Sequence, residues 1–132
     1  MSRRNVSSGV SWEKTVGYSR AVRVGNLIEV AGTAAVDEKG DVVGLNDPYR
    51  QAQYVLEKIG KALAEAGAGF GDVIRTRMFV TDIARWEEVG RAHGEVFRDV
   101  RPASTLVQVA SLVRPELLVE IEATAVAPEG AP

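Results

Sequence analysis

Residues 101–126, RPASTLVQVASLVRPELLVEIEATAV, contain two strand-like runs that enclose a short loop. In the second run, apolar residues alternate with Glu120, Glu122 and Thr124. A period of two places alternate side chains on opposite faces of a strand, so this strand has one apolar face and one acidic face. The two glutamates then lie on the same side, about 7 Å apart at the usual rise per strand residue.

The acidic face has two interpretations. Alternating charge is typical of a half-buried strand whose polar side meets water. Alternatively, one glutamate is a general acid or base in a cleft, where burial and neighbouring charges set its proton affinity. The pattern by itself does not separate these interpretations.

Length and composition predict one domain. The 132 residues are 45% hydrophobic and 26% charged, which is typical of a soluble globular chain. No apolar run approaches the roughly 20 residues that span a bilayer, so we expect no membrane partner. A formal net charge of −2 argues against broad nucleic-acid binding, which requires a basic surface.

Cysteine and histidine content restricts the chemistry. The chain has no cysteine, and His93 is its single histidine, so we expect neither a metal nor a cofactor. The start, MSRRNVSSGV, lacks the apolar segment of an export signal, so residues 1–13 are predicted to be a flexible tail. A cytoplasmic location fits both observations.

The first half of the chain predicts a hairpin and then a long helix. Gly25 and Asn26 form a turn between strand-like residues 21–24 and 27–32. Asn46 or Asp47 can cap a helix that has Pro48 in its first turn and ends before Gly67. The apolar residues at helical spacing are Ala52, Val55, Leu56, Ile59, Leu63 and Ala66.

Residues 73–80, VIRTRMFV, predict a further strand with two different faces. One face carries Ile74, Thr76, Met78 and Val80, and the other carries Arg75, Arg77 and Phe79. If the arginine face shares a sheet surface with the glutamates of the last strand, opposite charges pair across the strands.

A second helix is predicted after Asp82. Its apolar stripe is formed by Ile83, Trp86, Val89, Val96 and Phe97. His93 falls near the middle of the stripe, where a histidine is either a hydrogen-bonded core or interface residue or a proton-transfer group. Strands over residues 104–109 and 119–126 follow.

This order of elements predicts an α+β domain over residues 14–127, with a loose end at 128–132. One mixed sheet backed by two helices on a single face satisfies the order and leaves the other sheet face bare. That face carries Arg75, Arg77, Glu120 and Glu122 beside Phe79 and Leu118. Self-association would cover it and leave small-molecule clefts between subunits.

Several motifs resemble the RidA/YjgF family over residues 18–126. They are VGNLIEVAGTAAVD, EAGAGFGDVIRTRMFVTDIARWEEV and the RPAS…EIEATAV ending quoted above. The resemblance implies a chorismate-mutase-like fold, a homotrimer whose sheets form a central barrel, and three ligand clefts at subunit interfaces. It also implies hydrolysis of reactive enamines and imines, such as 2-aminoacrylate, to 2-oxo acids and ammonia, with no cofactor.

The resemblance also implies a set of site residues. Glu120 is the expected catalytic acid, Tyr18 and Glu120 match the family, and Gly32 follows the position of the family's pocket serine. The family's arginine after Pro-Ala is Ser104 here, followed by Thr105. Other departures are Ala31 for a serine, Gly90 for an asparagine and Leu106 for a position that is often cysteine, and His93 lies one turn from Gly90.

Replacement of the arginine decides which substrates we expect. A serine hydroxyl cannot supply the charge-assisted fork that holds a carboxylate. Arg77, Arg101 and Arg114 are possible substitutes, although each has a plainer role as a surface or interstrand charge.

Two hypotheses for function remain open. One is a hydrolase with altered specificity, in which Glu120 orients water, Tyr18 and Thr105 hydrogen-bond the substrate, and Ser104 makes a neutral contact. The other is a noncatalytic metabolite-binding or regulatory module that uses the same clefts. An RNA-directed activity is disfavoured by the acidic charge and by the lack of a histidine pair.

Overall fold

The computed structural model describes residues 1–130, in which six strands form one sheet in the order β1-β2-β3-β6-β4-β5. The strands are β1 (Arg3–Val6), β2 (Ala21–Val24), β3 (Leu27–Ala34), β4 (Val73–Val80), β5 (Ala103–Gln108) and β6 (Val119–Val126). β4 and β5 pair in parallel, whereas the other neighbouring pairs are antiparallel. The sheet is therefore mixed, as predicted.

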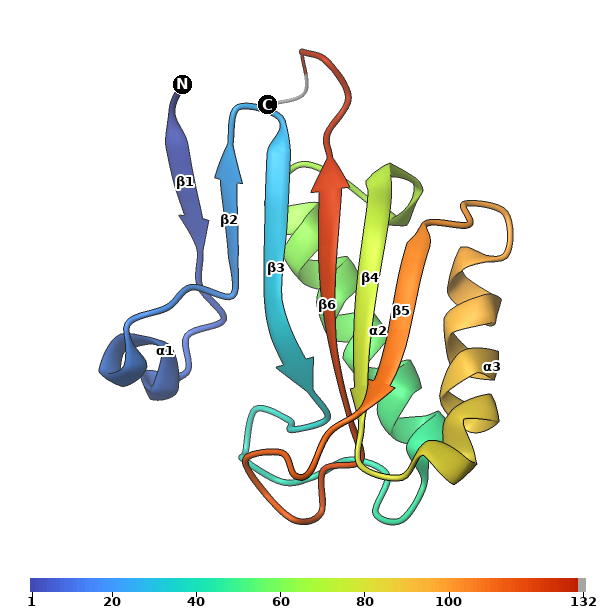
Figure 1. The fold of residues 1–132 in the computed structure, drawn as a ribbon. Helices are drawn as coiled ribbons and strands as arrows, with labels where there is room; N and C mark the ends of the chain where they lie inside the picture. The colour runs from blue at the N-terminus through green and yellow to red at the C-terminus, as the bar shows by residue number, and fades with distance from the viewer. Residues whose placement is uncertain (131–132) are drawn as a thin grey trace.

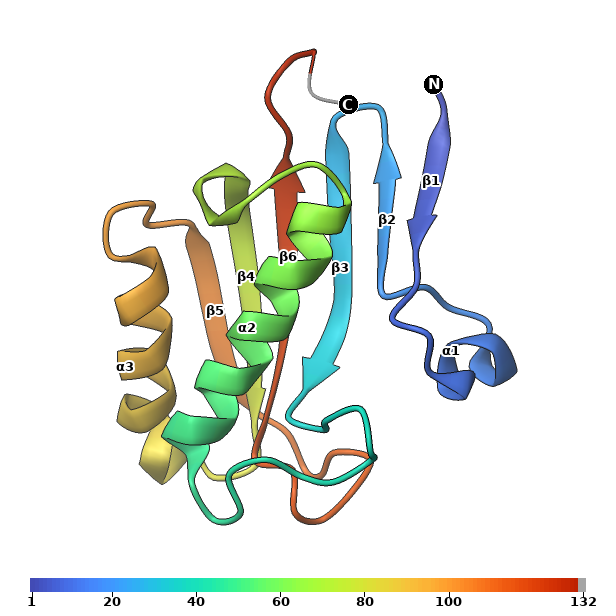
Figure 2. The same cartoon turned by 180° about the vertical axis from the view of Figure 1, so that it is seen from behind.

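Two helices, α2 (Pro48–Glu65) and α3 (Trp86–Phe97), lie against the same face of this sheet (Figures 1 and 2). A short helix, α1 (Ser11–Val16), lies beside the β1–β2 end, and 3₁₀ turns η1 (Phe70–Asp72) and η2 (Ile83–Arg85) precede β4 and α3. The helices leave the opposite sheet face bare, which confirms the predicted layers. No helix within residues 1–130 is long and apolar enough to cross a membrane.

Helix α2 supplies much of the core. The side chain of Asp47 accepts a hydrogen bond from the backbone N–H of Arg50, so Asp47 rather than Asn46 is the N-cap. Leu56, Ile59 and Leu63 recur on one face and are at most 1% exposed. They pack against the apolar side of β3 and β6, which fixes how the helix sits on the sheet.

The predicted flexible tail differs from what the structure contains. Residues 3–6 form β1, which pairs antiparallel with β2, and residues 11–16 form α1. Within β1 only Val6 is buried, so the strand has an exposed polar sequence that resembles a tail. Main-chain pairing holds this edge strand, aided by a hydrogen bond from Arg4 Nη2 to the Glu65 carbonyl. The predicted loose end at 128–132 extends beyond the described residues.

The predicted faces of β4 need one correction. Thr76, Met78 and Val80 are buried as expected, but Ile74 is 51% exposed. The pairing of β4 with β6 shifts between Val73 and Arg75, which indicates a β-bulge. The extra residue reverses the alternation of buried and exposed side chains before the bulge, so Val73 is buried and Ile74 is exposed.

The apolar stripe of the second helix also needs correction at its start. Val89 and Phe97 are buried, whereas Ile83 and Trp86 are exposed. Ile83 belongs to η2, whose tighter turn is out of phase with the α-helical stripe. A Cβ built at Gly90 would lie 3.6 Å from the Trp86 ring, so this indole covers its own helix.

The packing of α2 generates a stability prediction. Leu63→Ala should lower the free energy of unfolding by about 2–5 kcal/mol, because it leaves a cavity under the helix. Urea denaturation at a fixed protein concentration measures this change. The matched control is Lys61→Ala on the exposed side of the same helix, which should change stability by about 0.5 kcal/mol or less. Equal effects of the two substitutions would contradict the packing described here.

Candidate functional site

Glu120 lies on the bare face of β6, opposite an irregular part of β3. Pairing between the two strands shifts between Val30 and Thr33, so Ala31 and Gly32 lie in a bulge. A Cβ built at Gly32 would be 2.5 Å from Glu120 Oε2. A side chain at position 32 would therefore displace the carboxyl group from this place against the backbone.

The surroundings of Glu120 change its proton affinity. Burial raises the pKa of its carboxyl group above the usual glutamate range. The positive charge of Arg20 opposes this rise in pKa, and the negative charge of Glu122 adds to it. The net increase makes Glu120 a better proton donor near neutral pH than an exposed glutamate.

Arg20 was not singled out from the sequence, although it lies close to this carboxyl group. Its side chain is buried, and its Nη2 donates to the Gly32 carbonyl at 2.6 Å. Its guanidinium lies 5.7 Å from the centre of the Tyr18 ring. The alternation of Tyr18, Arg20 and Val22 along one extended segment was the available signal, because it puts the three side chains on one side.

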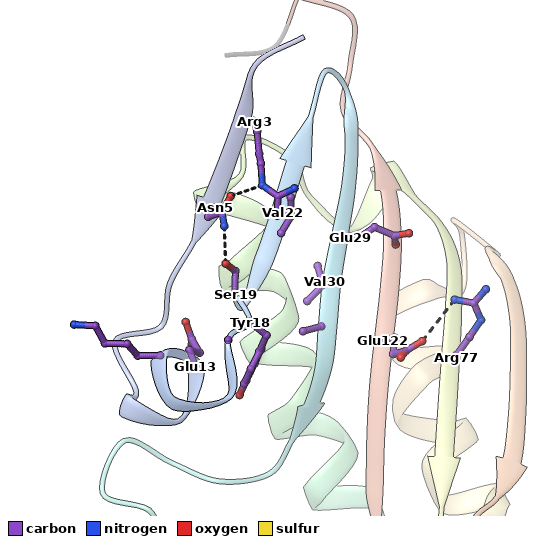
Figure 3. A pocket seen from close by; sticks show the side chains of 13 residues that line it. Arg3, Asn5, Glu13, Tyr18, Ser19, Val22, Glu29, Val30, Arg77 and Glu122 are labelled. Carbon is purple, nitrogen blue, oxygen red and sulfur yellow. Dashed lines mark hydrogen bonds and ion pairs between the residues drawn. The ribbon is translucent and has the colours of Figure 1, made fainter.

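An open hollow of about 760 Å³ extends over the bare face at its β1–β3 side (Figure 3). Two of the predicted site residues, Tyr18 and Ala31, are among those that line it. Its basic lining residues are Arg3, Lys14 and Arg77, and its acidic lining residues are Glu13, Glu29 and Glu122. This mixture of charges gives the hollow no strongly basic character.

The arginines proposed as substitutes have other partners or positions. Arg77 Nη1 lies 3.5 Å from Glu122 Oε1, which confirms the predicted cross-strand pairing between exposed side chains. Arg114 donates to the Gly40 carbonyl at 2.8 Å. Arg101 is exposed and adopts a positive φ of 54° two residues before β5.

Ser104 belongs to a second group of predicted residues, located between β5 and α3. Its hydroxyl accepts a hydrogen bond from Thr76 Oγ1 at 2.8 Å, and the same threonine oxygen lies 2.8 Å from His93 Nε2. Leu106 lies two residues further along β5 and packs against the core, and Gly90 is one turn before His93 on α3. β5 is an edge strand, which leaves Ser104 exposed.

Thr76 was placed correctly on the apolar face of β4 but was not recognised as part of a site. It is fully buried, and a buried hydroxyl requires a hydrogen-bond partner. That requirement was the sequence signal. Thr105, the neighbour of Ser104, points the other way and accepts from Arg75 Nη2 at 3.3 Å.

The two groups of predicted site residues lie on opposite faces of the sheet. Glu120 pairs laterally with Phe79 on β4, and Ser104 pairs with Thr76. Laterally paired residues point to the same face of a sheet. Thr76 and Phe79 are an odd number of residues apart on β4, so their side chains point to opposite faces. A single chain therefore keeps Glu120 and Ser104 on opposite faces. Within residues 1–130, no three acidic or histidine side chains are grouped to hold a metal ion.

Comparisons with known proteins give the family. The model of the endoribonuclease L-PSP family matches residues 10–127. A crystal structure of a YjgF/YER057c/UK114 family protein from Mycobacterium tuberculosis is 48% identical, with a TM-score of 0.87, covering 96% of this chain and 100% of that one. The 3-aminoacrylate deaminase RutC of Acinetobacter baylyi is 36% identical over 108 residues, or 82% of this chain and 85% of that protein.

An uncharacterised protein of Streptomyces coelicolor is also similar, at 42% identity over 123 residues, which are 92% of this chain and 90% of the relative. The chain belongs to the endoribonuclease L-PSP family, which is the RidA/YjgF family that its motifs resemble. Its fold is that of the YjgF structures.

The raised pKa of Glu120 generates a prediction about stability. A carboxyl group with a raised pKa in the folded state stabilises the fold below its unfolded-state pKa and loses this contribution as the pH rises through the folded value. Glu120→Gln removes that titration. The melting temperature of the variant, minus that of the wild type, should increase from about pH 4 to about pH 7. Calorimetry across this range measures the difference, and a constant difference would contradict the raised pKa.

Proposed function

We propose that the protein is a homotrimeric hydrolase that deaminates reactive enamines or imines in clefts between its subunits. The observation that carries the proposal is the half-buried Glu120, with a raised pKa, beside the Gly32 bulge. Membership of the family and 36% identity to a protein named as a 3-aminoacrylate deaminase support the reaction class. We also infer a cytoplasmic location from the absence of cysteine.

The two-faced arrangement supports a site that is shared between copies. Glu120, Gly32, Ala31 and Tyr18 belong to the bare-face side, and Ser104, Leu106, Gly90 and His93 belong to the β5–α3 edge. If the edge of one copy packs beside the bare face of the next, Ser104 of one subunit approaches Glu120 of its neighbour. Closed threefold symmetry repeats this contact and makes three equivalent clefts.

The reaction requires one group that exchanges protons with water. Protonation of the enamine carbon by solvent gives the iminium ion, and water then adds to its carbon while the π electrons move to nitrogen. Glu120 accepts a proton from the attacking water and returns it to the amine nitrogen. The carbinolamine hydroxyl then releases its proton to solvent as the carbon–nitrogen bond breaks, and ammonia and a carbonyl product leave.

Other residues bind and orient the substrate in this proposal. Tyr18 and Thr105 offer hydroxyl groups, and Ser104 offers a neutral hydrogen bond where a carboxylate-binding arginine would otherwise stand. Arg20 is a further group of the cleft because its positive charge acts on Glu120 and favours the ionised, base form of that carboxyl group.

Ammonia release tests the activity. Substrates are 2-aminoacrylate and larger imines without a carboxylate, generated in the assay by a second enzyme. Glu120→Gln should lower the enzyme-catalysed rate of ammonia release by about 100-fold or more, the usual contribution of a general acid or base. Glu122→Gln, two residues away on the same strand face, should have a far smaller effect.

The outcome separates the two hypotheses. If no substrate releases ammonia above the uncatalysed rate, the hydrolase proposal fails. Saturable metabolite binding that persists in Glu120→Gln, seen as a thermal shift without turnover, would then favour the noncatalytic module.

Sedimentation equilibrium tests the assembly. The wild type should sediment at three times its 14.2 kDa chain mass at micromolar concentration. Val22→Lys should reduce this mass, because it places a charge on the bare face, where Glu29 lies directly opposite and can pair with it in an isolated chain. A stable monomer of the wild-type protein would exclude the shared cleft.

A further inference from the structure

A continuous hydrogen-bonded chain connects the interior of the protein to its edge. It runs from His93 on α3 through Thr76 on β4 to Ser104 on β5. Thr76 Oγ1 lies 2.8 Å from His93 Nε2 and 2.8 Å from Ser104 Oγ. Thr76 is fully buried, His93 is half-buried and Ser104 is exposed. The exposed hydroxyl is therefore connected to an imidazole that lies inside the protein.

The number of available protons fixes what the chain can do. Thr76 has one hydroxyl proton, and in the arrangement seen it gives that proton to Ser104. His93 Nε2 must then carry a proton and donate it to Thr76, which leaves the Ser104 proton free to point outward. If each bond reverses, Ser104 donates inward and its oxygen accepts from outside.

Only a neutral imidazole permits both arrangements, since a charged one can donate to Thr76 but cannot accept from it. Burial lowers the pKa of His93 below its usual range, which favours the neutral form. The Phe97 ring lies 4.7 Å from the imidazole centre and packs edge-on against Phe70, so aromatic rings adjoin this end of the chain. The three hydrogen-bonded side chains, His93, Thr76 and Ser104, are thus all uncharged.

The need of buried polar atoms for hydrogen-bond partners explains the bond between Thr76 and His93 but not the bond between Thr76 and Ser104. His93 alone would satisfy the buried hydroxyl of Thr76. Ser104 is exposed and could bond to water instead, so its link to Thr76 is not required for the fold. The link does hold the serine oxygen in a defined position at the accessible edge.

We propose that His93, Thr76 and Ser104 form a neutral relay that binds an uncharged polar group of the ligand, such as an amide or ketone, at Ser104 Oγ. Ser104 makes the contact, and Thr76 and His93 act as positioning residues. The relay adapts to a donor or an acceptor by reversing its hydrogen bonds. It offers no cation, so it favours a carboxamide over a carboxylate of the same shape.

The inference rests on the proposed function for its location in a ligand cleft, and it deepens that proposal by naming the substrate class. The preferred enamine or imine carries a neutral amide, ester or ketone at the end that meets Ser104. Binding can be measured without turnover, so the relay and the hydrolase activity can fail separately.

The test uses the single histidine of the chain. Full-length protein is labelled with ¹⁵N-histidine, and long-range proton–nitrogen spectra report the tautomer of His93 without ambiguity. Pyruvamide and pyruvate are the probes, because they differ in charge and hardly in shape. Pyruvamide should shift the His93 ring nitrogens saturably. Pyruvate should bind about tenfold more weakly, equivalent to about 1.4 kcal/mol, because its carboxylate loses water at a contact that supplies no cation.

Matched variants separate the relay from a structural role. Thr76→Val keeps the shape of the side chain and removes its hydroxyl, so His93 should lose its preferred tautomer and its response to pyruvamide. Thr76→Ser retains a hydroxyl and should restore both. Ser104→Ala changes an exposed side chain and should preserve the His93–Thr76 bond while removing the pyruvamide response.

The named results decide the proposal. It is overturned if pyruvate binds as tightly as pyruvamide, if neither probe moves the His93 signals, or if Ser104→Ala responds like the wild type. An unchanged His93 spectrum in folded Thr76→Val would also overturn it. Loss of ammonia release alone, with the pyruvamide response intact, would refute the hydrolase and leave the relay supported.

Discussion

The alternation of side chains along β6 is the constraint on which the rest of the structure depends. Val119, Ile121 and Ala123 are buried on the side covered by the helices, and Glu120 and Glu122 must consequently emerge on the bare side. The helices bury the apolar side, so slippage by one residue would put carboxylates into the core. The same alternation on β4 and β5 puts Ser104 on the helix side. Any chemistry that needs both Glu120 and Ser104 consequently needs two copies of the chain.

Local irregularity adapts this regular sheet to a site. The bulge in β3 brings the Gly32 backbone against the Glu120 carboxyl group, and Arg20 bonds to the carbonyl of the same glycine. Burial and the nearby arginine act on the proton affinity of Glu120 in opposite directions, and burial dominates. The result is a carboxyl group with altered acidity on a rigid strand, which is a suitable position for proton transfer.

Ser104 connects residues of three different elements, β5, β4 and α3. A serine lacks the charge of an arginine, but its small hydroxyl is within hydrogen-bond distance of Thr76 and is linked through it to His93. The chain shares its fold with a 48% identical structural relative, at a TM-score of 0.87. In the proposed cleft, Ser104 and its two partners supply an uncharged contact.

The sequence determined the elements whose signals are local. The Gly25-Asn26 turn, the Asp47–Pro48 helix start, the β4 run and the alternating β6 run were all predicted, because caps, turns and periodicity act over a few residues. The motifs also determined the family. Tertiary structure decided the rest: β1 is held by pairing rather than composition, Ile74 is exposed by a bulge, and Arg20 and Thr76 acquire their roles from strands distant in sequence. Hydrogen bonds and burial between such distant segments depend on strand register, which no local pattern specifies.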